Sequence, residues 1–475
     1  MSETMSPTPT ATGETPVADP DPGRSTPLRH LRRRVAGRLH VPGDPSWAAA
    51  STPWLVNIEQ HPMAVLQVRD ADDVIAAVRW ADSHGVQVTA QPTGHGANDT
   101  LDDVLLLRTR ALADIDVDVR RRTAWVGAGV KAGELLAALD GTGLTFLAGS
   151  NPDPTVVGMT VTGGISWFGR RYGLGSDSIV TIELVDGLGR LRRVDASEDP
   201  ELFWALRGGG GAFGIITRME VALHPAPQLF GGRLLWPVAR TAEVLCAFAD
   251  VTAAAPEELT VWFHAYRFPP LPEVPEAVRG QAFASVAVAF LGPRAEAEVL
   301  LAPFRAIPDL ALDLLGDVPL ARLGGVADEP TEPMPGMQRS HLLTRLDERT
   351  VDALVASVGP DTGFPLPIVQ VRHLGGAFAR EDREPGAHGP VTEDYTLFAL
   401  GVPVAPQQEE AIRSRFDEIS SAVAPVASGR TLLNFLEAGE DPGRWWASET
   451  RARLQLAKRE SDPLGTIRSN RPVGR

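Results

Sequence analysis

The sequence has little of what several classes of protein require. Its 475 residues include one cysteine, Cys246, so neither an internal disulfide nor a cluster of metal-binding thiolates can form. No apolar run reaches the roughly 18–20 residues of a membrane-spanning helix. The 45 basic residues are outnumbered by 60 acidic ones, and the net charge of −15 repels nucleic-acid phosphates and acidic lipids. We therefore expect a soluble protein with no nucleic-acid or membrane partner.

The composition is that of an ordinary globular protein, with 43% apolar and 22% charged residues. The chain is too long for one hydrophobic core, so two domains are expected. Residues 1–26 are rich in proline, threonine and acidic residues and lack the apolar core of a secretion signal, which predicts a disordered tail and a cytoplasmic location. Cys246 lies on an apolar helix face and is expected to be a small buried residue rather than a nucleophile.

The first half of the chain predicts a β-α-β unit that ends at a glycine turn. An apolar strand at 64–68 precedes a helix that starts at Asp70 and stops at Gly85, and VQVTA forms the next strand. The turn that follows carries His95 between two glycines. Residues 123–139 then repeat the order of strand, glycine turn and helix.

Glycine is dense between residues 141 and 174. Such a stretch costs too much chain entropy to serve packing alone, so we expect its main chain to approach a ligand closely. Residues 179–196 predict a hairpin. Residues 200–227 predict a helix, a glycine loop and a strand.

The character of the sequence changes after Pro227. Strands at 259–268, 283–292 and 367–378 alternate with helices, which indicates an α+β domain built on an antiparallel sheet. The last segment, from residue 431, predicts one apolar strand and one amphipathic helix.

Two glycine motifs resemble a dinucleotide-binding fingerprint. Gly209, Gly211 and Gly214 follow a helix and precede a strand, which is the reverse of a Rossmann turn. The turn Gly127–Gly129–Ala132 has the right strand and helix but no acidic strand end about 20 residues later. It is interpreted as a tight packing turn, and an NAD-dependent enzyme using it is kept as an alternative. No serine-hydrolase elbow and no metal-binding histidine pair is present.

His95 is the most distinctive histidine. Its flanking glycines let the backbone approach a ligand and expose N–H groups to an anion. The residues alone leave two interpretations open, a ligand-holding histidine and a turn histidine that caps a carbonyl.

Several motifs, in order, resemble one family. QPTGHGAND around His95 is similar to the FAD-attaching histidine of the berberine-bridge-enzyme-like group of the vanillyl-alcohol-oxidase superfamily. WVGAGVKAGELLAAL, GSNPDPTVVGMTVTGGISWFGRRYGLG, DPELFWALRGGGGAFGIITRMEVALHP and LLNFLEAG follow as they do in that family. The resemblance covers nearly everything after residue 26 and is strongest over 60–227.

The resemblance implies an α+β, two-domain fold of the PCMH-type FAD-binding class. It implies an FAD-binding domain at 27–227 with its core at about 60–227, a substrate domain at 228–429 and a C-terminal segment, 430–475, that returns to the FAD domain. FAD would be attached through His95 alone, because Asn151 stands where bicovalent members carry a cysteine. The other implied FAD neighbours are Pro92, Thr93, Gly94, Gly96, Ala97, Asn98, Gly149, Ser150, Pro152, Asp153, Val157, Gly158, Thr160, Gly163, Gly164, Gly214, Ile215, Ile216 and Asn434.

The implied activity is that of an FAD-dependent oxidoreductase, an oxidase by expectation. A hydride would pass from a CH–OH or CH–NH carbon of a small organic molecule, such as a secondary metabolite, to flavin N5, with O2 as acceptor. Two further activities stay open, a flavin dehydrogenase that avoids O2 and a non-catalytic flavin-binding protein. No metal is implied, and the oligomeric state stays open.

The proton acceptor is not identified by the resemblance, because Leu432 stands where relatives often have tyrosine. Arg372 and His373 alternate along one strand, so only one of them can face the site. Trp262 and Tyr172 are further possibilities. The candidates for catalytic residues are Asn434, His264, Tyr266, Arg372, His373 and Tyr395.

Overall fold

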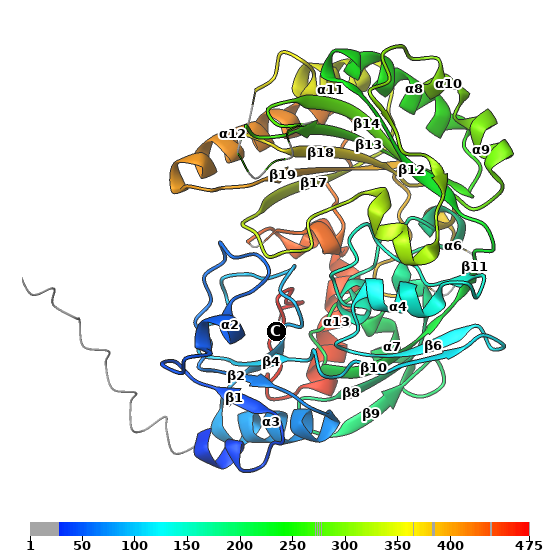
Figure 1. Cartoon of the computed structure of the whole chain (residues 1–475). Coiled ribbons are helices and arrows are strands. Elements are labelled where there is room, and N and C mark those ends of the chain that lie inside the picture. The colour runs from blue at the N-terminus through cyan, green and yellow to red at the C-terminus, as the bar shows by residue number, and fades with distance from the viewer. Residues whose placement is uncertain are drawn as a thin grey trace, which may run out of the picture.

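The structure, a computed structural model, describes residues 28–474 apart from 271, 273, 275, 277, 364, 382–384 and 438. The predicted tail at 1–26 lies outside these residues. Figure 1 shows two bodies, one from the first half of the chain and one from the second, with the C-terminal segment back against the first. Within the described residues, no helix has both the length and the apolar character needed to cross a bilayer.

The first sheet contains the predicted β-α-β unit. Its strands lie in the order β1 (Arg38–His40), β2 (Ala64–Gln67), β4 (Leu105–Arg108) and β3 (Val88–Ala90), and β2, β4 and β3 are parallel. Helix α3 (Ala71–His84) begins where the Asp70 side chain accepts a hydrogen bond from the Asp73 N–H and ends at Gly85, whose φ is +64°. The short helix α2 (Trp47–Ser51) lies beside β2.

The second sheet is antiparallel throughout. Its order is β5 (Ile115–Asp118), β6 (Thr123–Gly127), β10 (Ile215–Ala222), β8 (Ile179–Val185) and β9 (Leu191–Val194). The β8–β9 hairpin and the order of helix, glycine loop and strand at 200–222 are confirmed. The remaining elements of this half are α4 (Ala132–Leu139), β7 (Leu144–Thr145), α5 (Val156–Val161), α6 (Gly169–Tyr172), η1 (Gly175–Ser178), α7 (Pro200–Leu206) and β11 (His224–Pro225).

The third sheet belongs to the second half, and its pairs are antiparallel as predicted. The strand order is β15-β12-β14-β13-β18-β19-β17, with β16 also on β12. The strands are β12 (Phe230–Pro237), β13 (Leu259–Arg267), β14 (Ala282–Phe290), β15 (Leu312–Asp313), β16 (Gly316–Asp317), β17 (Met337–Leu343), β18 (Ile368–His373) and β19 (Tyr395–Gly401).

The long helices cover one face of this sheet (Figure 1). Helices α8 (Thr241–Ala254), α11 (Glu348–Val358) and α12 (Pro406–Val423) bury apolar side chains against it and form one core. The other face is turned toward the first half of the chain. This arrangement confirms the α+β class. The shorter elements here are η2 (Val238–Arg240), α9 (Arg294–Leu300), α10 (Ala302–Arg305), η3 (Leu320–Val326) and η4 (Gly376–Ala379).

The C-terminal segment returns to the first half. Ile467 forms a parallel bridge with Val88 of β3, and the Lys458 ammonium donates to the carbonyls of Ala212 and Ile467. The predicted helix is α13 (Ser448–Ser461). The predicted apolar strand is wrong: residues 433–435 form the 3-10 turn η5 (Leu433–Phe435), because Asn434 bonds to a loop of the first half instead of a neighbouring strand. The turn η6 (Pro442–Arg444) follows.

The change of sheet coincides with the change of sequence character. β11 ends at Pro225 and β12 begins at Phe230, and we propose domains at 27–227 and 228–429 with a returning segment at 430–475. The expectation that Cys246 is buried is wrong. Helix α8 buries Val244, Leu245 and Phe248 but leaves Cys246 exposed.

Candidate active site

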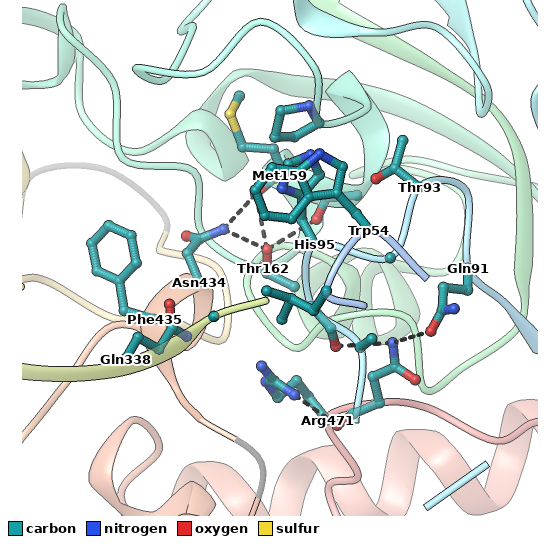
Figure 2. A pocket seen from close by; sticks show the side chains of 18 of the residues that line it. Trp54, Gln91, Thr93, His95, Met159, Thr162, Gln338, Asn434, Phe435 and Arg471 are labelled. Atoms are coloured by element: carbon teal, nitrogen blue, oxygen red, sulfur yellow. Dashed lines mark hydrogen bonds between the residues drawn. The ribbon is translucent and has the colours of Figure 1, made fainter. Parts of the chain in front are cut away.

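A cavity of about 630 Å³ lies where the two halves meet. One wall comes from turns of the first half, including 89–97, 149–165 and 211–216. The opposite wall comes from strands of the third sheet, and residues 433–437 and 468–471 close the cavity from the C-terminal side. Figure 2 shows His95 and Trp54 on the first wall, with Asn434, Phe435 and Gln338 across from them.

The turn that carries His95 depends on Gly94. Gly94 has φ of +97°, and a Cβ there would lie 2.7 Å from the main-chain nitrogen of Trp54. Without a side chain at this position, the Trp54 N–H reaches the Thr93 carbonyl at 3.0 Å. The indole of Trp54 then stacks on the imidazole of His95, with ring centroids 4.1 Å apart. The glycine therefore sets the plane of the histidine ring.

The His95 ring is also held at its edge. Its Nε2 lies 2.8 Å from Oδ2 of Asp153, and Oδ1 of the same carboxylate accepts from the Lys131 ammonium. Burial favours the neutral form of Asp153, but the bonds from His95 and Lys131 outweigh it and lower the pKa of this carboxyl. Asp153 is thus held as an anion behind the histidine.

The side chain of Asn434 connects the C-terminal segment to the glycine-rich loop through hydrogen bonds. Its Oδ1 accepts from the Gly164 N–H at 2.9 Å, and its Nδ2 donates to the Met159 carbonyl and the Thr162 hydroxyl. The amide lines the cavity, yet its polar atoms are engaged with the loop (Figure 2). Asn434 therefore positions the wall of the cavity.

The C-terminal residues 468–471 line the cavity and were not identified from the sequence. The Asn470 side chain donates to the Gly96 carbonyl at 3.1 Å, and Asn98 donates to the Asn470 carbonyl at 2.6 Å. Among the described residues, Oδ1 of Asn470 and Nε of Arg468 are buried without a hydrogen-bond partner. A cavity wall that holds an unpaired acceptor and an unpaired donor can bind a polar ligand, because buried polar groups normally have hydrogen-bond partners.

The sheet wall presents a buried cation. Arg372 of β18 is 4% exposed and lies 4.2 Å from the ring centroid of Trp262 and 5.0 Å from that of Phe435. Its guanidinium donates to Gln370 at 2.8 Å and reaches Glu329 at 3.4 Å. Burial lowers the pKa of Arg372, an effect that Glu329 opposes. Arg372 can donate to a polar group of a bound molecule.

Glu437 is a cavity carboxylate that the sequence analysis missed. It follows the Asn434 turn and accepts from the Gln338 N–H at 3.2 Å. Burial raises the pKa of Glu437 above its ordinary value, and the neighbouring Glu440 adds to the rise, although the bond from Gln338 opposes it. A partly buried carboxylate with a raised pKa is suited to accept a proton near neutral pH.

His264 and Tyr266 share a sheet face with Arg372 but do not line the cavity. His264 pairs with Gln370, and Tyr266 pairs with Ile368. The β18 partners line the cavity, whereas His264 and Tyr266 lie one strand farther away, on β13. The segment at 327–329 bonds to Arg233 and Arg372 above this face. Burial lowers the pKa of His264 to about 3 and raises that of Tyr266 to about 12, so neither is prepared for proton transfer near neutral pH.

The remaining side-chain candidates are not among the described residues that line the cavity. His373 accepts from Arg170 at 2.7 Å, and the Tyr395 hydroxyl bonds to Thr252 in α8 at 2.7 Å. As expected from their alternation along β18, only one of the two residues Arg372 and His373 lines the cavity, and that residue is Arg372. Trp262 stacks on Trp167 at 3.5 Å, and Tyr172 donates to the Pro225 carbonyl.

Comparison with known proteins places residues 62–195 in the FAD binding domain family. (R)-6-hydroxynicotine oxidase of Paenarthrobacter nicotinovorans is 31% identical over 221 residues, 46% of this chain and 48% of that one. Berberine bridge enzyme-like 28 of Arabidopsis thaliana is 34% identical over 39% of this chain and 35% of its own length. The relatives of this chain thus include 6-hydroxynicotine oxidase and berberine-bridge-enzyme-like proteins.

The similarity in fold extends over nearly the whole chain. The crystal structure of 6-hydroxy-D-nicotine oxidase from Arthrobacter nicotinovorans covers 93% of this chain and 98% of that one, with a TM-score of 0.81 and 23% identity. Berberine-bridge-enzyme-like 1 of Physcomitrella patens covers 95% and 100%, with a TM-score of 0.83 and 19% identity. In sequence, the match spans about half the length of the first of these curated relatives.

FAD is the cofactor that the domain indicates, and the cavity fits it. Its volume lies within the ~300–1,000 Å³ typical of ligand sites. Most implied FAD neighbours line this cavity: Pro92, Thr93, Gly94, His95, Gly96, Ala97, Gly149, Ser150, Val157, Gly158, Gly214, Ile215, Ile216 and Asn434.

Six implied neighbours support the cavity lining from behind or lie outside it. They are Asn98, Pro152, Asp153, Thr160, Gly163 and Gly164. Asp153 holds His95, and the carbonyls of Gly163 and Gly164 accept from the turn at Ser176 and Gly175. Their conformations shape the loop, because Gly163 and Gly164 have φ of +110° and +79°.

The alternative of an NAD site at Gly127–Gly129–Ala132 is wrong. Strand β6, which leads into this turn, lies between antiparallel neighbours β5 and β10, whereas a Rossmann turn needs a parallel β-α-β unit. A Cβ at Gly129 would lie 2.2 Å from the Thr109 carbonyl oxygen. The glycines permit close packing of main chains, as the tight-turn interpretation predicted.

Proposed function

We propose that this protein is an FAD-dependent oxidase that holds its flavin covalently through His95. Its substrate would be a small organic molecule with a CH–OH or CH–NH carbon. The observation that carries the proposal is the cavity itself, which joins the His95 turn of an FAD-binding domain to a sheet wall bearing Arg372 and Glu437. The name of the (R)-6-hydroxynicotine oxidase relative supports an oxidase.

When bound, FAD supplies a two-electron acceptor for the substrate hydride and passes the electrons to O2. The protein supplies position and a proton acceptor. The turn at 92–97, the N-terminus of α5 and residues 468–471 would hold FAD, with the orphan Asn470 Oδ1 and Arg468 Nε as hydrogen-bonding groups. Asn434 keeps the glycine-rich loop fixed against the C-terminal segment.

Glu437 is proposed as the proton acceptor. Oxidation of an alcohol or amine releases a proton from oxygen or nitrogen together with the hydride from carbon. The Glu437 carboxylate lines the cavity, and the Gln338 N–H fixes one of its oxygens. Arg372 would donate to a polar group of the substrate, while Phe398, Phe435 and Leu400 pack against its apolar part.

The covalent link is tested with His95→Ala. Wild-type protein should keep its yellow colour and flavin fluorescence after acid precipitation, whereas the variant should release all of its flavin into the supernatant. Flavin that stays with the denatured variant would overturn the role of His95. A wild-type protein that stays colourless in excess FAD would overturn the flavoprotein itself.

The oxidase proposal has a separate test. Anaerobic mixing with a panel of alcohols and amines should bleach the flavin absorbance for a true substrate, and readmission of air should restore it with one peroxide released per flavin. Bleaching without reoxidation by air would indicate a dehydrogenase. The substrate, a role in secondary metabolism and the cytoplasmic location remain predictions.

A further inference from the structure

We propose that Asp153 prepares His95 for covalent attachment of the flavin through Nδ1, and that Lys131 holds Asp153 in place for this task. The inference rests on the covalent link proposed above. Beyond that link, Asp153 sets the tautomer of the His95 ring and stabilises its charge during attachment.

Four contacts fix the pair. The Nε2 atom of His95 lies 2.8 Å from Oδ2 of Asp153, and the Lys131 ammonium bonds to Oδ1. The Asp153 N–H donates to Oδ1 of Asn151 at 2.8 Å, which holds the backbone of the acid. Trp54 stacks on the imidazole face. The Asp153 side chain is 9% exposed and that of His95 21%, so the pair is shielded while the ring stays accessible from the cavity.

These contacts select one tautomer of His95. A carboxylate accepts hydrogen bonds and cannot donate them, so Nε2 must carry the hydrogen. A neutral imidazole then has its lone pair on Nδ1. Among the described residues, no hydrogen bond engages Nδ1. The ring therefore offers Nδ1 as its nucleophilic atom. The lowered pKa of Asp153 is consistent with this, because an ionised acid is what the tautomer requires.

Nδ1 of His95 forms a bond to the 8α methyl carbon of the flavin, and one C–H bond of that methyl group breaks. The methyl proton and the Nε2 proton leave, and the flavin ring gains two electrons and two protons. O2 then takes the two electrons and two protons and departs as hydrogen peroxide. The Asp153 anion stabilises the positive charge that develops on the imidazole, and the Nε2 proton then leaves the alkylated ring to water.

Asp153→Asn tests the proposal by replacing the anion with an amide of the same shape. Apoprotein from riboflavin-starved cells is mixed with FAD, and samples are acid-precipitated over time to measure covalent flavin. Loss of the anion that stabilises the developing imidazolium predicts roughly a 100-fold slower attachment, with non-covalent FAD binding retained. Lys131→Met should slow attachment less. Asp102→Asn, an exposed acid in the loop after the His95 turn, is the control and should attach at the wild-type rate.

Three results separate this inference from the function on which it rests. Attachment at the wild-type rate in Asp153→Asn and Lys131→Met would overturn the role of Asp153 and leave the His95 link intact. NMR of the flavin-carrying peptide should show attachment at Nδ1, and attachment at Nε2 would overturn the tautomer argument. If wild-type protein binds FAD but forms no covalent product, the proposed covalent bond between His95 and FAD is wrong.

Discussion

The two walls of the cavity are built in different ways. The wall from the first half is made of turns, where Gly94 and the loop around α5 bring the main chain close to the cavity. The wall from the third sheet is made of side chains, with Arg372, Gln370 and Phe398 brought together by strand register. The first wall is specified by local backbone geometry and the second by the pairing of distant strands.

This difference matters for function. A cofactor can be held by a wall whose form depends on glycine and main-chain groups. A substrate must be distinguished by side chains, and a sheet face allows these to vary while the strands stay in place. We expect changes in the turn wall to affect FAD retention, and changes in the sheet wall to affect turnover and substrate binding.

The largest effect is expected at Glu437, beside the sheet wall. Glu437→Gln removes the proposed proton acceptor but preserves the size of the side chain and an oxygen for the Gln338 N–H. General-base catalysis typically contributes ~10²–10⁴-fold, so kcat should fall by about that range while covalent flavin stays at the wild-type level. Steady-state kinetics and flavin absorbance measure the two quantities. An unchanged kcat would remove Glu437 from the mechanism.

The pH dependence sharpens this test. A base works when it is deprotonated, so activity should fall as the pH drops through the raised pKa of Glu437, above the ordinary value for glutamate. The charged neighbours include Glu440, Arg339, Arg413 and Arg471; Glu440 raises the pKa of Glu437, whereas Arg339 and Arg413 lower it. Glu440→Gln should therefore move the acid limb of the kcat/KM profile to lower pH. A limb that moves to higher pH would contradict this assignment.

The next largest effect is expected at Gly94, in the turn wall. Gly94→Ala places a Cβ 2.7 Å from the Trp54 nitrogen at a φ of +97°, a strain of about 1–3 kcal/mol. FAD binding should weaken by roughly ten- to a hundredfold, measured by titration of apoprotein. Gly43→Ala is the matched control, since Gly43 has φ of +94° but no atom within 4 Å of the added Cβ. Equal losses of FAD in both variants would show that backbone strain alone, rather than close approach, is responsible.

The smallest effect is expected from a pair of neighbours on opposite faces of β18. Arg372→Met removes the cation from the cavity and should raise KM about tenfold, with covalent flavin unchanged. His373→Phe leaves Arg170 without one acceptor and should lower the free energy of unfolding by about 1–3 kcal/mol with little change in KM. Kinetics and thermal denaturation of both variants provide the readout. A raised KM in His373→Phe together with a loss of stability in Arg372→Met would contradict the assignment of Arg372 to the cavity and of His373 to the support of Arg170.

Much of the fold could be predicted because its signals are local. Helix α3 has a capping aspartate at one end and a glycine at the other, and the β8–β9 hairpin has its turn residues in sequence. The segment at 431–436 was misassigned because its apolar residues satisfy a strand pattern, whereas the hydrogen bonds of Asn434 to a loop 270 residues away decide its conformation. Cys246 was misplaced because the position of a helix face depends on which sheet it covers.

The turns of this protein follow from its amino-acid sequence alone. A residue without a side chain permits a positive φ or a close approach wherever it stands, so the His95 turn and the glycine-rich loop could be located before any packing was known. Which side chains meet in the cavity, by contrast, depends on how distant segments pack. Strand register put Arg372 there and kept His264 beneath a covering segment, and the returning C-terminal segment added Glu437 and Asn470, because such contacts are fixed by pairing across hundreds of residues.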